Sequence, residues 1–166
     1  CPYNLSRPEM DVVQKKLCLF PWQKIFFTRL CYSTMQSVFG TTQLPLDRLN
    51  CKSRILLITG IANPFPLQRM LSERQAEVAT MRFNDHHRFS KADVKAVNRA
   101  FIQAGPEAIA VTTEKDAARL RFVEGLEQRL KERLYAIPLS IDFIDGQKEV
   151  FNTIITRYVK ENRRNG

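Results

Sequence analysis

The sequence lacks any apolar run long enough to cross a membrane, and it has few cysteines. Its longest apolar stretches, such as residues 55–58, have the length of a strand, so any membrane contact is expected to be peripheral. The cysteines form no Cys-x-x-Cys pair and have no ligand-like spacing to the histidines: Cys1, Cys18, Cys31 and Cys51. We therefore expect no zinc site, and free thiols in a reducing compartment are the default interpretation.

Glycine is also scarce, and the six glycines are scattered singly along the 166 residues. No G-x-x-x-x-G-K-[ST] motif occurs. Such a loop binds phosphate oxygens through consecutive backbone N–H groups. The sequence therefore predicts no loop of its own that could hold a nucleoside triphosphate.

Acidic residues are outnumbered, with 17 Asp and Glu against 26 Lys and Arg and a net charge of +9. This balance favours an anionic partner: a phosphate, an acidic lipid headgroup or a nucleic acid. A basic nucleic-acid-binding module is one alternative, although no helix-turn-helix signature or aromatic-rich platform for single strands supports it. One basic series is typical of a solvated surface, with contact to anionic lipid as the alternative: Arg119, Arg121, Arg129, Lys131 and Arg133.

The two histidines of the chain, His86 and His87, are neighbours and follow Asp85. Histidine titrates near neutral pH, and a nearby carboxylate can orient it as a general base or proton relay. Two alternatives stay open. The triplet could be a solvated loop after a strand, or part of a metal-dependent phosphoesterase, although no other histidine exists to complete such a metal site.

Strand-like and helix-like patterns alternate along the central part of the chain. Strands are predicted at 54–59, 78–83 and 108–112, each followed by a helix. The predicted caps are Asn63 with Pro64 next to it, Ser90 with Asp93, and Thr113 with Asp116. Flanking segments 24–32 and 134–143, the latter interrupted by Pro138, are predicted to be extended, and 33–53 a loop. The fold class is α/β, a mostly parallel sheet with helices on both faces.

In such a sheet every loop from a strand to a helix leaves at the carboxyl edge, where ligands bind. The loops 60–64, 84–90 and 112–116 should therefore line one edge. Lys115 could bind a phosphate there with Glu114 beside it, or it could be a solvated lysine behind a plain cap. Asn63 could cap its helix or direct its amide at a ligand.

Three stretches, 56–64, 83–90 and 111–120, resemble in order and separation the C-terminal half of the bacterial tetraacyldisaccharide 4'-kinases of lipid A biosynthesis. The resemblance implies a P-loop-kinase-like enzyme that uses ATP and Mg²⁺. It would phosphorylate the 4' hydroxyl of an acylated glucosamine disaccharide phosphate, tetraacyldisaccharide 1-phosphate, to make lipid IVA. It also implies a peripheral position at the cytoplasmic face of the bacterial inner membrane, and no nucleic acid partner.

The resemblance assigns roles as well. His86 with Asp85 would be catalytic, together with an aspartate from the other half of the enzyme, and no metal ligand is assigned. Substrate or nucleotide contacts would come from Asn63, Thr113, Glu114, Lys115 and Asp116. We expect residues 1–166 to be a single C-terminal domain whose P-loop partner domain is absent. Segments 24–32 and 134–143 would be the two linker strands, and the chain alone would be inactive.

Overall fold

The computed structural model describes residues 5–85 and 87–163, which belong to two compact units. Unit 1 comprises residues 1–31 and 140–166, and unit 2 comprises residues 32–139. Each unit has its own sheet. The predicted catalytic residue His86 lies outside the described residues.

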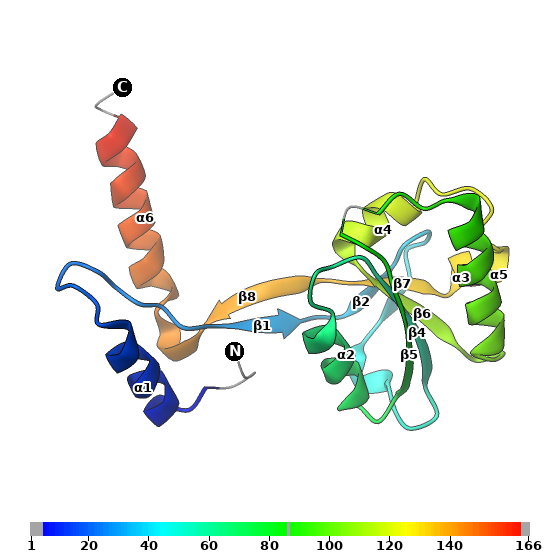
Figure 1. The fold of residues 1–166 in the computed structure, drawn as a ribbon, viewed down its shortest axis with the longest axis horizontal. Helices are drawn as coiled ribbons and strands as arrows, with labels where there is room; N and C mark the ends of the chain where they lie inside the picture. The colour runs from blue at the N-terminus through cyan, green and yellow to red at the C-terminus, as the bar shows by residue number, and fades with distance from the viewer. Residues whose placement is uncertain (1–4, 86, 164–166) are drawn as a thin grey trace. The chain divides into compact units, whose positions relative to one another are not determined.

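Unit 2 contains a six-stranded sheet in the order β3-β2-β7-β6-β4-β5 (Figure 1). The strands β4, β5, β6 and β7 are parallel, and β2 is antiparallel to both β3 and β7. Their bounds are β2 Met35–Ser37, β3 Gln43–Leu44, β4 Arg54–Thr59, β5 Glu77–Arg82, β6 Ile109–Thr113 and β7 Leu134–Ile137. The predicted α/β class with a mostly parallel sheet is confirmed.

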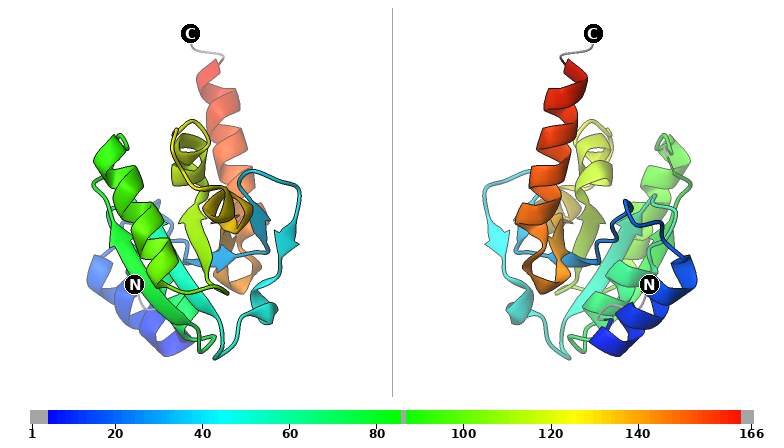
Figure 2. Two further views of the ribbon diagram at one scale, coloured as in Figure 1. Left: turned by 90° about the vertical axis from the view of Figure 1, so that its right-hand side faces the viewer. Right: turned by 90° about the vertical axis from the view of Figure 1, so that its left-hand side faces the viewer.

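Helices cover both faces of this sheet, as predicted (Figures 1 and 2). Side chains along β4 alternate between the faces. Leu56 and Ile58 pack in one core cluster with α3, α4 and α5, whereas Ile55 and Leu57 pack in the other with α2. The helices are α2 Phe65–Ser72, α3 Lys91–Gln103, α4 Glu114–Leu120 and α5 Gln128–Glu132, and a 3₁₀ helix η1 spans Leu46–Arg48.

The predicted caps at Ser90 and Thr113 are confirmed. The Ser90 hydroxyl accepts the Asp93 N–H at 3.2 Å, and the Thr113 hydroxyl accepts the Asp116 N–H at 3.1 Å. The α2 helix begins one residue later than predicted, because Pro64 is its cap. Asn63 lies just before the cap, and its side-chain oxygen accepts the Phe65 N–H at 3.2 Å.

Unit 1 contains two helices and a two-stranded sheet of β1 and β8. The strands are antiparallel, since Phe27 O accepts the Ile144 N–H while Arg29 pairs with Asp142 at 2.7 Å. The bounds are α1 Arg7–Leu17, β1 Thr28–Tyr32, β8 Leu139–Phe143, the 3₁₀ helix η2 Ile144–Gly146 and α6 Lys148–Arg163. A role for this strand pair as an interdomain linker stays a prediction.

The segment 134–143 is not one linker strand, because it divides at Pro138. Its first part, β7, is a strand of the main sheet between β6 and β2, and only β8 pairs with β1. Proline has no N–H to donate to a ladder, so one strand ends before it and another begins after it. Of the segment 24–32, only Thr28–Tyr32 is a strand.

The segment 33–53 is also more ordered than predicted, since it contains β2, β3 and η1. Two members of the basic series, Arg121 and Arg129, make side-chain contacts within unit 2. Arg121 donates to Val38 O at 3.0 Å, and Arg129 donates to Gly105 O at 2.7 Å while its guanidinium lies over the Phe101 ring. These side chains satisfy backbone carbonyls and so hold loops of unit 2 in place.

Candidate active site

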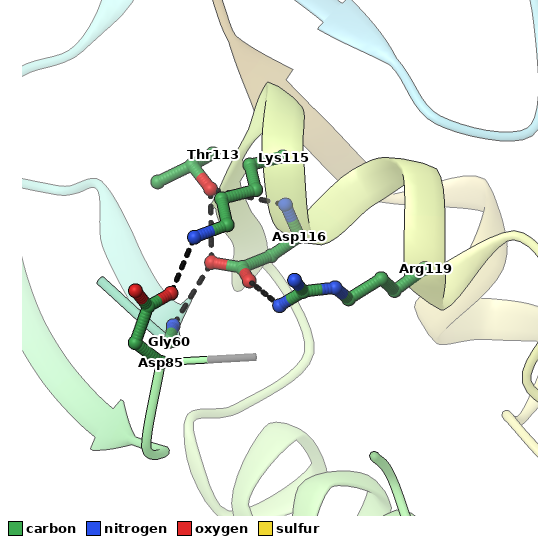
Figure 3. A network of polar contacts seen from close by, with 6 residues as sticks. All are labelled: Gly60, Asp85, Thr113, Lys115, Asp116 and Arg119. Atoms are coloured by element: carbon green, nitrogen blue, oxygen red, sulfur yellow. Dashed lines mark hydrogen bonds and ion pairs between the residues drawn. The ribbon is translucent and has the colours of Figure 1, made fainter. Parts of the chain in front are cut away.

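A buried carboxylate, Asp116, connects two of the predicted loops at the carboxyl edge of the sheet (Figure 3). Only 1% of its surface is exposed. One oxygen, Oδ2, accepts the N–H of Gly60 at 2.9 Å and the hydroxyl of Thr113 at 2.9 Å. The other oxygen faces the guanidinium of Arg119 at 3.5 Å. Burial without such partners would be unfavourable, so the carboxylate holds the loop after β4 against the start of α4.

Gly60 allows the loop after β5 to approach the other two loops closely. A Cβ atom at this position would lie 3.0 Å from the carbonyl oxygen of Asn84 and 3.2 Å from Oδ1 of Asp116. Both neighbours are held in place, one as backbone and one as a buried carboxylate. The loops after β4, β5 and β6 therefore meet around a residue without a side chain.

Lys115 and Asp85 extend this network toward solvent. The Lys115 ammonium forms an ion pair with a carboxylate oxygen of Asp85, and both side chains are partly exposed (Figure 3). The pair joins the loop after β5 to the first turn of α4. It places an acceptor and a cation next to each other, both within reach of a ligand at the carboxyl edge.

A cavity of about 360 Å³ opens beside the same turn of α4. Glu114 borders it and accepts the N–H of Leu139 at 3.4 Å. Most of the other side chains that line the cavity are apolar. The lining residues are Tyr32, Ile61, Leu67, Thr113, Glu114, Lys115, Ile137 and Leu139. A mostly apolar cavity with a few polar groups is typical of a small-molecule site.

His87, the second histidine of the triplet, faces the start of α3. Its Nε2 lies 2.9 Å from an oxygen of Asp93, and its ring stacks on Phe83 with 4.9 Å between centroids. The backbone N–H and the hydroxyl of Ser90, and then His87, lower the pKa of Asp93 to about 2. His87 is therefore engaged with a helix cap, and its ring is packed between aromatic side chains.

The structure brings together four of the predicted site residues: Asp85, Thr113, Lys115 and Asp116. Glu114 borders the neighbouring cavity, and Asn63 is bound to the start of α2. Gly60 and Arg119 were missed as members of the site. Gly60 had a signal, since it directly follows a buried strand at a predicted binding edge, whereas Arg119 looked like any exposed arginine.

Within residues 5–85 and 87–163, no three His, Cys, Asp or Glu side chains are arranged as ligands for a metal ion. The helices of this described part are all too short or too polar to cross a lipid bilayer.

The sequence profile described as tetraacyldisaccharide-1-P 4'-kinase matches residues 15–160. The chain belongs to this kinase family. A tetraacyldisaccharide 4'-kinase of Bacteroides fragilis is 37% identical over 172 residues, which cover 100% of this chain and 46% of that protein. The tetraacyldisaccharide 4'-kinase of Bacteroides thetaiotaomicron is 35% identical, and the match covers 99% of this chain and 46% of that protein. The chain thus spans about half the length of these relatives.

Among solved structures, LpxK from Aquifex aeolicus, crystallised in complex with ATP, is similar with a TM-score of 0.50. The superposition covers 84% of this chain and 38% of the Aquifex chain, at 18% sequence identity. At 18% identity, this similarity supports the fold alone.

Proposed function

We propose that the protein containing this chain is an ATP-dependent kinase that phosphorylates the 4' hydroxyl of tetraacyldisaccharide 1-phosphate to give lipid IVA. Membership of the family supports this proposal. The observation that carries it is the meeting of Gly60, Asp85, Lys115 and Asp116 at one sheet edge, from the three loops in which the sequence resembles the kinases.

The loop after β4 contains a single glycine, and the N–H of Gly60 is already donated to Asp116. These residues do not form a cradle for a triphosphate, which needs several free backbone N–H groups. We therefore propose that a separate P-loop domain holds ATP and Mg²⁺.

For the chain itself we propose three roles at the acceptor hydroxyl. His86, together with an aspartate from the other half of the enzyme, accepts the proton of the sugar hydroxyl, and Asp85 next to His86 supports the charged imidazole. Lys115 holds the Asp85 carboxylate and supplies a positive charge to phosphate oxygens at the edge. Asp116 is a positioning residue, because its hydrogen bonds fix the loops that carry the other two.

We place the substrate or nucleotide contacts of this chain at the cavity beside α4, which Thr113, Glu114 and Lys115 line. Asn63 and Asp116 are engaged in backbone hydrogen bonds, which supports a positioning role for both. Because the proposed acceptor carries acyl chains, the enzyme would work as a peripheral protein at the cytoplasmic face of the inner membrane.

The decisive experiment measures phosphoryl transfer from labelled ATP to the lipid disaccharide by the full-length protein. His86→Ala should lower kcat by about a hundredfold or more, in the range that general acid-base groups contribute, with little change in KM for ATP. His87→Ala is the matched control and should have a milder effect, since His87 faces Asp93. Near-normal turnover of the His86 variant, or an effect confined to KM for ATP, would remove its catalytic role.

Two further assays separate this proposal from its alternatives. The isolated chain should fold but not phosphorylate the disaccharide, since it lacks a triphosphate cradle. Robust kinase activity of the isolated chain would contradict the proposal that a separate P-loop domain holds ATP. Hydrolysis of a generic phosphodiester by the chain after metal addition would favour a phosphoesterase instead.

A further inference from the structure

The connection between α1 and β1 presents two large aromatic side chains to solvent at a tight turn. Phe20 is 59% exposed and Trp22 is 77% exposed. Their rings stack on each other with 4.9 Å between centroids and 2° between planes. Leu17, at the end of α1, is also more than half exposed. Side chains of this size lose favourable burial when they stay in water, so a grouped set of them indicates a binding surface.

The turn that carries the rings is held by hydrogen bonds. The N–H of Gln23 donates to Phe20 O at 2.9 Å, and the side-chain oxygen of Gln23 accepts the N–H of Phe20 at 3.0 Å. Pro21, between the two rings, restricts the backbone further. The aromatic pair is therefore displayed in a fixed arrangement, which lowers the entropy that binding would remove.

Lysines flank this turn in the sequence, and the turn itself contains no acidic residue. Lys15 and Lys16 lie in the last turn of α1, Lys24 follows the turn, and all three are exposed. The sequence contains no Asp or Glu from residue 12 to residue 46. Figure 1 shows this part of the chain in blue, between α1 and β1.

We propose that this aromatic tip, made of Leu17, Phe20 and Trp22 with Lys15, Lys16 and Lys24, inserts into the surface of an anionic lipid bilayer. Tryptophan and phenylalanine prefer the boundary between headgroups and acyl chains, and lysines beside them meet the phosphates of anionic lipids. The aromatic tip, with its apolar side chains and the lysines beside them, matches this boundary in both chemistry and charge. This membrane site rests on the proposed function, which requires a peripheral contact with the membrane, and it names the residues that make that contact.

Trp22 makes the test direct, because it is the single tryptophan of the chain. The isolated chain is mixed with vesicles of phosphatidylethanolamine and phosphatidylglycerol, and with vesicles of phosphatidylcholine alone. On the anionic vesicles, tryptophan emission should shift to shorter wavelength and should be quenched by brominated acyl chains. Added salt should weaken binding. Vesicle binding is measured without phosphorylation, so this test can fail while the kinase proposal stands.

Two variants keep Trp22 as the reporter and remove the other determinants. Phe20→Ser, and the triple change of Lys15, Lys16 and Lys24 to Gln, should each weaken partitioning onto anionic vesicles at least about tenfold. The matched controls are Phe122→Ser, whose ring is 87% exposed in unit 2, and the change of Lys52, Lys91 and Lys95 to Gln. Both controls should bind as the unchanged chain does.

Several results would overturn the inference. Trp22 could stay fully accessible to aqueous iodide on bound vesicles, or the controls could weaken binding as much as the test variants. Quenching of Trp22 by a single-stranded oligonucleotide, with no response to anionic vesicles, would assign the tip to nucleic acid instead.

Discussion

Asp116 shows how much one buried carboxylate can organise. It begins as a local feature, since Thr113 and Asp116 are the cap and third residue of a short helix and could be predicted from their spacing. The hydrogen bond from the Gly60 N–H to Asp116 could not be predicted in this way, because the two residues are 56 positions apart. A sequence pattern reports neighbours along the chain, whereas this contact depends on the order of strands in the sheet.

Replacing Asp116 by Ala should lower the free energy of unfolding by about 1–3 kcal/mol, because the Gly60 N–H and the Thr113 hydroxyl lose a buried acceptor. Chemical denaturation followed by circular dichroism would measure the change. The control is Asp47→Ala, which removes an exposed carboxylate from the same unit. Equal stability of the Asp116 and Asp47 variants would show that the buried network does not support the site.

At the scale of elements, length decides what the sequence could predict. The strands β4, β5 and β6 and the helix α3 have enough residues to show a period or a cap. The strands were predicted within one residue, and α3 begins after its predicted cap, Ser90. The strands β2 and β3 have three and two residues, and α5 has five, which is too few for a period. Their position depends on pairing and packing with distant segments.

The start of α3 should make unit 2 sensitive to acid. The pKa of Asp93 is about 2 in the folded chain against an ordinary 3.8, because Ser90 and His87 hydrogen-bond to the ionised carboxylate. A carboxyl with a lowered pKa in the folded state stabilises the fold above its unfolded pKa, and this contribution is lost as the pH falls from about 4 toward 2. Asp93→Asn should therefore lose less stability than the unchanged chain over this range.

Thermal unfolding at a series of pH values between about 6 and 2.5 would measure that difference in slope. Glu124→Gln, which changes an exposed carboxylate of the same unit, should keep the slope of the unchanged chain. Parallel curves for the Asp93 variant and the unchanged chain would contradict the assignment.

At the scale of the whole molecule, the two units differ in how much core they contain. Both core clusters consist of residues between Met35 and Ile137, which all belong to unit 2. The buried apolar residue of unit 1 among the described residues is Met10, and α6 has no buried residue. The sequence predicted one domain for residues 1–166, and apolar periodicity alone could not have divided it, since α1 and α6 are amphipathic like the helices of unit 2.

We expect residues 32–139 to fold without unit 1, because hydrophobic burial supplies most of the stability of a domain and both clusters remain complete. The shortened chain should unfold cooperatively on heating, within about 5 °C of the main transition of the whole chain. Leu57→Ala, at a fully buried position of β4, serves as the matched probe of the core. It should destabilise both chains by the same amount, about 2–5 kcal/mol, because its cavity forms inside unit 2 in either case. A shortened chain that melts without a cooperative transition, or one in which Leu57→Ala has no effect, would show that unit 1 is needed to complete the core.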